Sequence, residues 1–223
     1  MRGPSNLARP TIFVVDDDAA VRDALKLLLR SVGHAVETFG SAQEFLDAYG
    51  EDRAGCLVLD IRMPGMSGLE LQQKLNEKHS ILPIIFITGH GDVPMAVTAM
   101  KSGAADFIQK PFRDQDLIDR INKALGRDRE RRKGRAEEDE IRGRIALLTP
   151  REKEVMQRVV RGQANKVIAL DLGVSQRTVE LHRARVMKKL RLRSVAELVH
   201  TVDRIGGVVG SGATMPPGTA ASQ

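Results

Sequence analysis

The fold of the first half of the chain is decided by one short stretch, CLVLDIRMP at residues 56–64. It opens with a continuous apolar run and then meets a carboxylate, Asp60. A run of this length and character is typical of a strand buried on both faces, as in the parallel sheet of an α/β protein. The sequence therefore predicts a buried strand over residues 56–60 with an acidic side chain at its carboxyl end.

Outward from this stretch, short apolar runs alternate with amphipathic segments. The runs predict further strands, and the segments, some with an N-cap residue or a terminating glycine, predict helices. The expected strands cover residues 11–15, 34–39, 84–88 and 106–109, and the expected helices 19–31, 41–49, 67–78, 93–101 and 114–125. Five successive strand–helix units predict an α/β domain whose parallel sheet is covered by helices on both faces.

Polar side chains follow four of the five expected strands. Asp16 and Asp17 come after the first strand, Asp60 ends the third, Thr88 ends the fourth and Lys110 follows the fifth. Because a parallel sheet binds its ligands beyond the carboxyl ends of the strands, we expect these side chains to converge there. Three carboxylates in one place repel each other, and hard oxygen ligands of this kind suit Mg²⁺.

This arrangement predicts chemistry on phosphorus. A metal-bound, ionised Asp60 is a nucleophile toward a phosphoryl group. Mg²⁺ and the ammonium of Lys110 would neutralise the incoming charge, and Thr88 would donate its hydroxyl to a phosphoryl oxygen. Arg62 and His90, two residues after Asp60 and Thr88, are expected to flank the phosphoryl group and to limit the access of water.

The two halves of the chain differ in charge. Residues 11–125 carry a net charge of −5 and residues 145–206 a net charge of +7, within a chain of 223 residues. The length suits two domains, and the basic half predicts a polyanionic partner. The single cysteine, Cys56, excludes an intrachain disulfide and suits a reducing compartment. No apolar run approaches the roughly 20 residues of a membrane span, so we expect a cytoplasmic protein with no membrane partner.

The sequence of the second half predicts a small all-α domain. A helical pattern begins at Thr149, with Pro150 at the first helical position and Glu152 at the capping-box position. The charged segment before it, residues 126–144, is either a linker or a solvated extension of the preceding helix. The expected bounds are 1–10 for an N-terminal tail, 11–125 for the first domain, 126–144 for the linker, 145–206 for a four-helix second domain and 207–223 for a disordered C-terminal tail.

Residues 166–190 have the form of a helix-turn-helix, with a short helix, a glycine turn and a longer second helix. One face of the second helix is apolar and should be core, carrying Val179, Val186 and Leu190. Another face is a basic stripe broken by small or apolar side chains, namely Arg177, Leu181, Ala184, Arg185 and Lys188. Such a stripe suits a helix that enters the major groove of DNA.

On these motifs, residues 11–125 resemble the receiver domain of bacterial response regulators, a flavodoxin-like (βα)5 fold with a parallel sheet. The resemblance is carried by VVDDD at 14–18, LDIRMP at 59–64, ITG at 87–89 and DFIQKPF at 106–112. The run GHGDVPMAV at 89–97 is similar to the FixJ branch in particular. Asp18 stands where the family often has Glu, which is a small departure.

The resemblance implies a role for each acidic residue. Asp60 would accept a phosphoryl group from a sensor histidine kinase. Asp17 and Asp60 would bind Mg²⁺ together with the backbone carbonyl of Arg62, and Asp16 would act largely through water.

The resemblance also implies roles around the phosphoryl group. Thr88 and Lys110 would hold it, and Phe107 would be the switch aromatic, turning inward as Thr88 moves. The peptide bond before Pro111 is expected to be cis, as it often is in this family.

The second half resembles the LuxR-type output domain over about residues 145–206. The resemblance is carried by LTPRE at 148–152, Asn165-Lys166, Ile168-Ala169 and VSQRTVELHR at 174–183. By analogy, Glu180, Leu181 and Ala184 lie at base-reading positions. Plausible phosphate contacts are Lys166, Thr178, His182 and Lys188, although His182 serves equally well as a half-buried packing residue.

Together the halves predict a two-component response regulator of the FixJ/NarL type. It would not be an enzyme beyond Mg²⁺-dependent self-phosphorylation and slow autodephosphorylation. The unphosphorylated receiver would mask the DNA-binding half or keep the chain monomeric. Phosphorylation would then favour a homodimer on double-stranded DNA, with RNA polymerase as a further partner.

The sequence argues against three other functions. An aspartyl phosphohydrolase requires a second Asp two positions after the nucleophile, where this chain has Arg62. A nucleotide-binding fold requires a glycine-rich loop after the first strand, and none is present there. A regulator whose second half no longer binds DNA is disfavoured by the intact basic stripe.

Overall fold

The computed structural model describes residues 9–50, 53–89 and 93–206. The chain divides into two units, Met1–Lys133 and Gly134–Gln223, and each is described by itself. Most of the predicted N-terminal tail, all of the predicted C-terminal tail and His90 lie outside the described residues.

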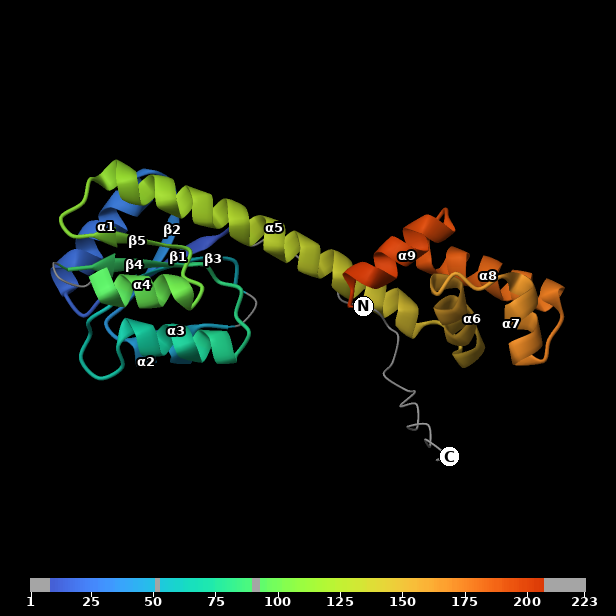
Figure 1. Ribbon diagram of the computed structural model, residues 1–223. Coiled ribbons are helices and arrows are strands. Elements are labelled where there is room, and N and C mark those ends of the chain that lie inside the picture. Colours follow the sequence, from blue (N-terminus) through green and yellow to red (C-terminus); the bar gives the residue numbers. More distant parts are fainter. Residues whose placement is uncertain (1–8, 51–52, 90–92, 207–223) are drawn as a thin grey trace, which may run out of the picture. The chain divides into compact units, whose positions relative to one another are not determined.

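The first unit is built on a five-stranded parallel sheet (Figure 1). Its strands are β1 (Thr11–Val15), β2 (Ala35–Phe39), β3 (Gly55–Asp60), β4 (Ile84–Thr88) and β5 (Asp106–Gln109). They lie in the order β2-β1-β3-β4-β5, and every described pair is parallel. The predicted α/β receiver fold is therefore confirmed, and the four strand ends that carry the predicted polar residues lie at one edge of the sheet.

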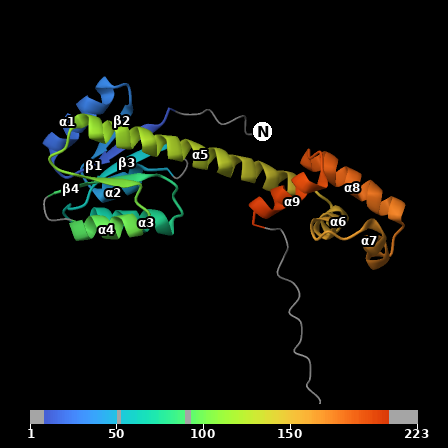
Figure 2. The ribbon, with the colours of Figure 1, turned by 45° about the horizontal axis from the view of Figure 1, so that its top comes forward.

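Helices cover both faces of this sheet (Figure 2). The helices are α1 (Ala19–Ser31), α2 (Ala42–Ala48), α3 (Gly68–Glu77), α4 (Val93–Lys101) and α5 (Asp114–Ala146). Leu25 and Leu29 of α1 share a buried cluster with Leu117 and Ile121 of α5. The cluster on the other face contains residues of α2, α3 and α4, such as Phe45. The predicted two-sided layering is present, and Cys56 is a buried core residue of β3.

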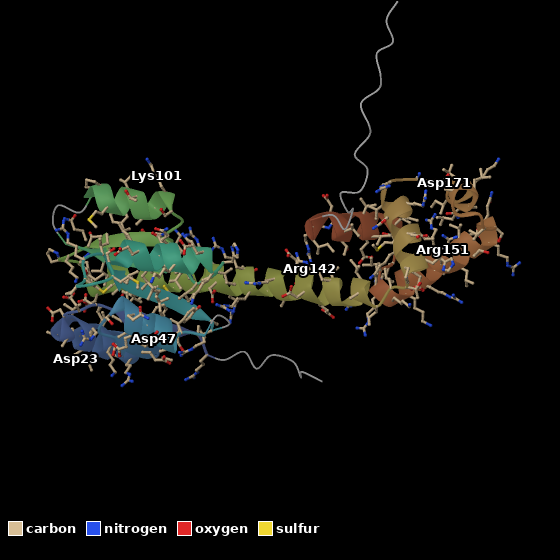
Figure 3. The ribbon with its side chains drawn as sticks, turned by 90° about the horizontal axis from the view of Figure 1, so that it is seen from below. Asp23, Asp47, Lys101, Arg142, Arg151 and Asp171 are labelled. Atoms are coloured by element: carbon tan, nitrogen blue, oxygen red, sulfur yellow. The ribbon has the colours of Figure 1, made fainter. Side chains whose placement is uncertain are left out.

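Helix α5 is much longer than the predicted segment 114–125. The charged segment 126–144 continues this helix, with pairs one turn apart such as Arg142 with Glu138 (Figure 3). The segment is not wholly solvated, because Asp128 is only 2% exposed. Its carboxylate accepts hydrogen bonds from the backbone N–H of Gly55 (3.1 Å) and from Nε of Arg132 (2.8 Å). The first two turns of the expected linker thus belong to the packed part of the first unit.

The second unit contains four further helices in its described part. They are α6 (Pro150–Val160), α7 (Asn165–Leu172), α8 (Gln176–Leu190) and α9 (Val195–Arg204). The predicted capping box of α6 is present, with Thr149 and Glu152 bonding each other's backbone N–H. One apolar core joins all four helices to Ile145 of α5. Within the described ranges, no helix has the length and apolar character needed to cross a membrane.

Candidate functional site

The sheet brings the predicted acceptor and its neighbours to one level. Val15 of β1 pairs in register with Leu59 of β3, so Asp16 and Asp60 follow at equivalent positions on adjacent strands. Lys110 follows β5, and its backbone N–H donates to the carbonyl of Thr88 at the end of β4 (2.8 Å). Four strand ends therefore contribute to a single site, as the sequence predicts.

One ammonium bridges the two buried carboxylates. Nζ of Lys110 lies 3.0 Å from Oδ2 of Asp16 and 3.1 Å from Oδ1 of Asp60. The other oxygen of Asp60 accepts from the backbone N–H of Arg62 (2.7 Å), and the other oxygen of Asp16 accepts from that of Asp18 (2.9 Å). Each carboxylate is thereby held at both oxygens, so its orientation is fixed before any ligand arrives.

Burial and neighbouring charges shift the pKa values of both Asp60 and Lys110. Burial raises the pKa of Asp60, and the charge of Asp16 raises it further, while the hydrogen bond from Lys110 opposes both. Burial alone would lower the pKa of Lys110, but its bonds to Asp16 and Asp60 outweigh that effect and raise it. Lys110 is therefore a firmly charged group beside a carboxylate whose ionisation is resisted.

The third acidic residue is placed differently from its neighbours. The side chain of Asp17 is exposed, and Asp17 takes no part in the ion pair made by Lys110. Within the described residues, no group of three acidic, His or Cys side chains is placed to hold a metal ion. The expected convergence of Asp16, Asp17 and Asp60 is thus realised for Asp16 and Asp60, which share Lys110, and not for the exposed carboxylate of Asp17.

Asp18 starts helix α1 rather than joining the pair. Its carboxylate accepts from the backbone N–H of Ala20 (2.8 Å), the N-cap interaction. Arg22 donates from one nitrogen, Nη1, to the backbone carbonyls of Asp16 (2.7 Å) and Asp17 (2.9 Å). Sequence patterns did not single out Arg22, because a contact from a side chain to two carbonyls leaves no motif.

The remaining predicted residues of the site differ in how exposed their side chains are. Thr88 is 3% exposed, while the ring of Phe107 on β5 is 38% exposed and is not turned inward. The Lys110–Pro111 peptide bond is cis, which confirms that prediction. Arg62 contributes its backbone beside Asp60.

Gly68 is a second residue that the motif analysis missed. A Cβ on this glycine would lie 2.2 Å from the backbone oxygen of Asp60, closer than any real contact. Its N–H also donates to the carbonyl of Ile61 (3.0 Å). Helix α3 therefore approaches the chain at the acceptor closely enough to require glycine, and the only signal in the sequence is Ser67-Gly68 at a helix start.

In the second unit, helix α8 separates its two predicted faces. Its buried residues are Val179, Val186 and Leu190, as expected. All residues of the predicted basic stripe are exposed, namely Arg177, Leu181, Ala184, Arg185 and Lys188. Glu180 and, on α7, Lys166 are exposed as well. The structure thus leaves one face of α8 free for a ligand while the opposite face holds the core.

Two of the predicted phosphate contacts are less accessible. Thr178 is partly buried, and its backbone N–H donates to the Ser175 hydroxyl that caps α8 (3.1 Å). His182 is also partly buried, and its Nδ1 is enclosed with no hydrogen-bond partner among the described residues. His182 is therefore half-buried, and it lies between the two roles that the sequence left open, a phosphate contact and a packing residue.

Comparison with known proteins supports both halves. The response regulator receiver domain family matches residues 12–122, and the luxR family of bacterial regulatory proteins matches residues 146–202. Nodulation protein W of Bradyrhizobium diazoefficiens is 48% identical over 195 residues, covering 87% of this chain and 86% of the relative. The transcriptional regulatory protein FixJ of the same organism is 46% identical, covering 87% of this chain and 95% of the relative.

Solved structures give the same result. The response regulator StyR matches with a TM-score of 0.79 at 50% identity, covering 88% of this chain and 100% of that one. Full-length FixJ from B. japonicum matches with a TM-score of 0.55 at 46% identity, covering 88% of this chain and 97% of that one. The chain therefore belongs to the FixJ-like two-component response regulators, which join a receiver domain to a LuxR-type DNA-binding domain.

Proposed function

We propose that Asp60 is the phosphoryl acceptor of this regulator and that its phosphorylation controls the binding of helix α8 to specific DNA. The observation that carries the proposal is the position of Asp60. It ends β3, it is 9% exposed, and one of its oxygens lies 3.1 Å from the ammonium of Lys110. A nucleophile fixed beside a cation is suited to receive a negatively charged group.

The transfer is a displacement at phosphorus. A carboxylate oxygen of Asp60 forms a bond to phosphorus as the bond to the donor's leaving atom breaks. The leaving atom is an imidazole nitrogen in a histidine kinase or a carboxylate oxygen in acetyl phosphate, and it keeps the electron pair. Lys110 stabilises charge on the phosphoryl oxygens, and Thr88 donates its hydroxyl to one of them. The chain acts as a substrate in this step rather than as an enzyme with turnover.

The site also fits Mg²⁺. Hard oxygen donors would come from the carboxylates of Asp16 and Asp60 and from the carbonyl of Arg62, with the exposed carboxylate of Asp17 turning toward them. When bound, Mg²⁺ supplies positive charge that offsets the excess of carboxylates and the incoming phosphoryl group. Lys110 neutralises only one of the two buried carboxylates, which is why a second cation suits this chain.

The DNA-binding half carries the output. We infer that Glu180, Leu181 and Ala184 of α8 read base edges, while Arg177, Arg185, Lys188 and, on α7, Lys166 contact phosphates. Thr178 and His182 lie at the margin of this surface. The bound form is a homodimer on paired half-sites that meets RNA polymerase in the cytoplasm, where the DNA is. In this proposal the receiver domain covers residues 11–125 and the DNA-binding domain residues 145–206. Residues 126–133 pack onto the receiver through Asp128.

The acceptor is tested by chemical phosphorylation. The full chain is incubated with acetyl phosphate and Mg²⁺, and the addition of one acid-labile phosphate is followed by intact mass. Asp60→Asn should remove the labelling, and Asp23→Asn, an exposed acid on α1 (Figure 3), should not. Labelling of Asp60→Asn at the wild-type rate would show that another residue is the acceptor.

The DNA face is tested by two variants of α8 with different expected effects. Lys188→Ala should weaken binding equally on specific and random DNA and flatten the salt dependence by about one unit. Leu181→Ala should act mainly on the specific duplex, because base contacts carry sequence information. Equal losses from both variants on both duplexes would remove this face from sequence readout.

A further inference from the structure

Arg22 holds the backbone of the acidic loop from outside the site. It lies in the first turns of α1, and its Nη1 donates to the carbonyls of Asp16 (2.7 Å) and Asp17 (2.9 Å). A Cβ on Gly40, after β2, would lie 3.7 Å from both Cζ and Nη1 of Arg22. The guanidinium therefore covers the chain where two adjacent strands end.

The position of this cation is electrostatically unusual. A positive side chain near a helix N-terminus is disfavoured by the helix dipole. Two charge-assisted hydrogen bonds to carbonyls offset this cost. Arg22 also places positive charge beside three consecutive carboxylates, Asp16 to Asp18, of which only Asp16 has Lys110 as a partner.

The contacts fix the two residues differently. Asp16 is held on both sides, since Lys110 binds its carboxylate and Arg22 binds its carbonyl. Asp17 is held by its carbonyl, and its carboxylate stays exposed. The direction in which the Asp17 side chain leaves the loop is therefore set by the peptide that Arg22 binds.

We propose that Arg22 is a positioning residue for phosphoryl transfer, holding the Asp16–Asp17 backbone so that the exposed Asp17 carboxylate can turn onto a divalent cation beside Asp16 and Asp60. The inference rests on the proposed function, because it assumes the cation site. Arg22 contacts neither Asp60 nor a carboxylate oxygen of Asp16 in the described contacts, so it acts through the loop. Its loss should weaken metal binding while leaving the acceptor and Lys110 intact.

The test measures metal binding directly in the full, unphosphorylated chain. Mn²⁺ is titrated by electron paramagnetic resonance, with Mg²⁺ as competitor, for wild type, Arg22→Ala, Arg22→Lys and Arg30→Ala. Arg30→Ala is the matched control, because it removes the same charge from the last turn of the same helix. The Mg²⁺ dependence of labelling by acetyl phosphate is recorded in parallel, and circular dichroism checks folding.

Arg22→Ala should raise the metal dissociation constant roughly tenfold, the loss of about one charge-assisted hydrogen bond. Arg22→Lys should lie between Arg22→Ala and wild type, Arg30→Ala should match wild type, and saturating Mg²⁺ should restore labelling of Arg22→Ala. A wild-type dissociation constant in Arg22→Ala, or in Arg22→Lys if the alanine variant does not fold, overturns the inference. If the wild-type chain binds no metal, the proposed cation site itself is overturned. Labelling of Asp60 by acetyl phosphate, measured in parallel, then shows whether the proposed acceptor role still holds.

Discussion

Strand β3 has a buried carboxylate arrangement at each of its ends, and the two are built differently. At the start of the strand, Asp128 accepts from Nε of Arg132 with both oxygens (2.8 and 3.0 Å) and from the N–H of Gly55. At the end of the strand, Asp60 and Asp16 share the single ammonium of Lys110. The first end therefore has one carboxylate paired with one cation, whereas the second end has two carboxylates that share one cation.

The difference separates a structural ion pair from a reactive one. The Asp128 pair is neutral and its hydrogen bonds tie α5 to the first residue of β3, so it stabilises the receiver and has no charge left to offer. The Asp16–Asp60–Lys110 group carries one excess negative charge in a buried place. Burial raises the pKa of Asp60, and the charge of Asp16 raises it further, so the ionised form of this carboxylate is disfavoured here. A second cation would relieve this excess, and a phosphoryl group would add to it.

The largest expected effect is on transfer at the reactive end. Lys110→Ala should lower the rate of labelling by acetyl phosphate roughly 100-fold, because one preorganised charge on the phosphoryl oxygens is lost. Arg132→Ala, which removes the cation at the other end, should leave the labelling rate of folded protein within about twofold, since it touches no reacting atom. Similar losses of labelling rate in the two variants would contradict the proposed distinction between a structural and a reactive ion pair.

The next effect is on stability at the structural end. Asp128→Ala should lower the free energy of unfolding of the receiver by about 2–3 kcal/mol, because it leaves the Gly55 N–H without its acceptor and removes the carboxylate that Arg132 binds. Urea unfolding of the full chain measures this, with Glu130→Ala, an exposed acid on the same helix, as control. If Asp128→Ala unfolds at the same urea concentration as Glu130→Ala, the pair does not stabilise the receiver.

The smallest effect is a gain in stability at the reactive end. Because the pKa of Asp60 is raised in the folded state, its ionised form opposes folding above that pKa and ceases to do so below the ordinary value of 3.8. Asp60→Asn should therefore raise the Tm of the receiver at pH 7 without Mg²⁺, and the gain should shrink as the pH falls toward 3.8. Calorimetry checks this, and a gain that grows with acidity would reverse the assigned sign.

The sequence was sufficient for features with a local signal. Buried runs placed β1, β4 and β5, and the glycine turn placed the start of α8. The reactive residues were found because their strands all end at one sheet edge, a property of parallel topology. Asp16 and Asp60, far apart in the chain, could be grouped for that reason alone.

Contacts between distant backbone and side-chain groups could not be predicted. Nothing in the pattern around Asp128 indicates that it meets Gly55, 73 residues earlier, so the segment read as charged and solvated. Arg22 and Gly68 act on backbone atoms of the acidic residues, which any residue type supplies. The exposed position of the Asp17 carboxylate likewise depends on the geometry of the loop, which no spacing encodes.

The most direct test of the account joins the two domains. A duplex selected in vitro by the phosphorylated protein is compared with a version cut to one half-site, and both are titrated by fluorescence anisotropy with and without acetyl phosphate and Mg²⁺. Phosphorylation should raise affinity for the paired site at least about tenfold, change the single half-site little, and have no effect in Asp60→Asn. Equal affinity in both states, or a normal response in Asp60→Asn, would contradict control of DNA binding through Asp60.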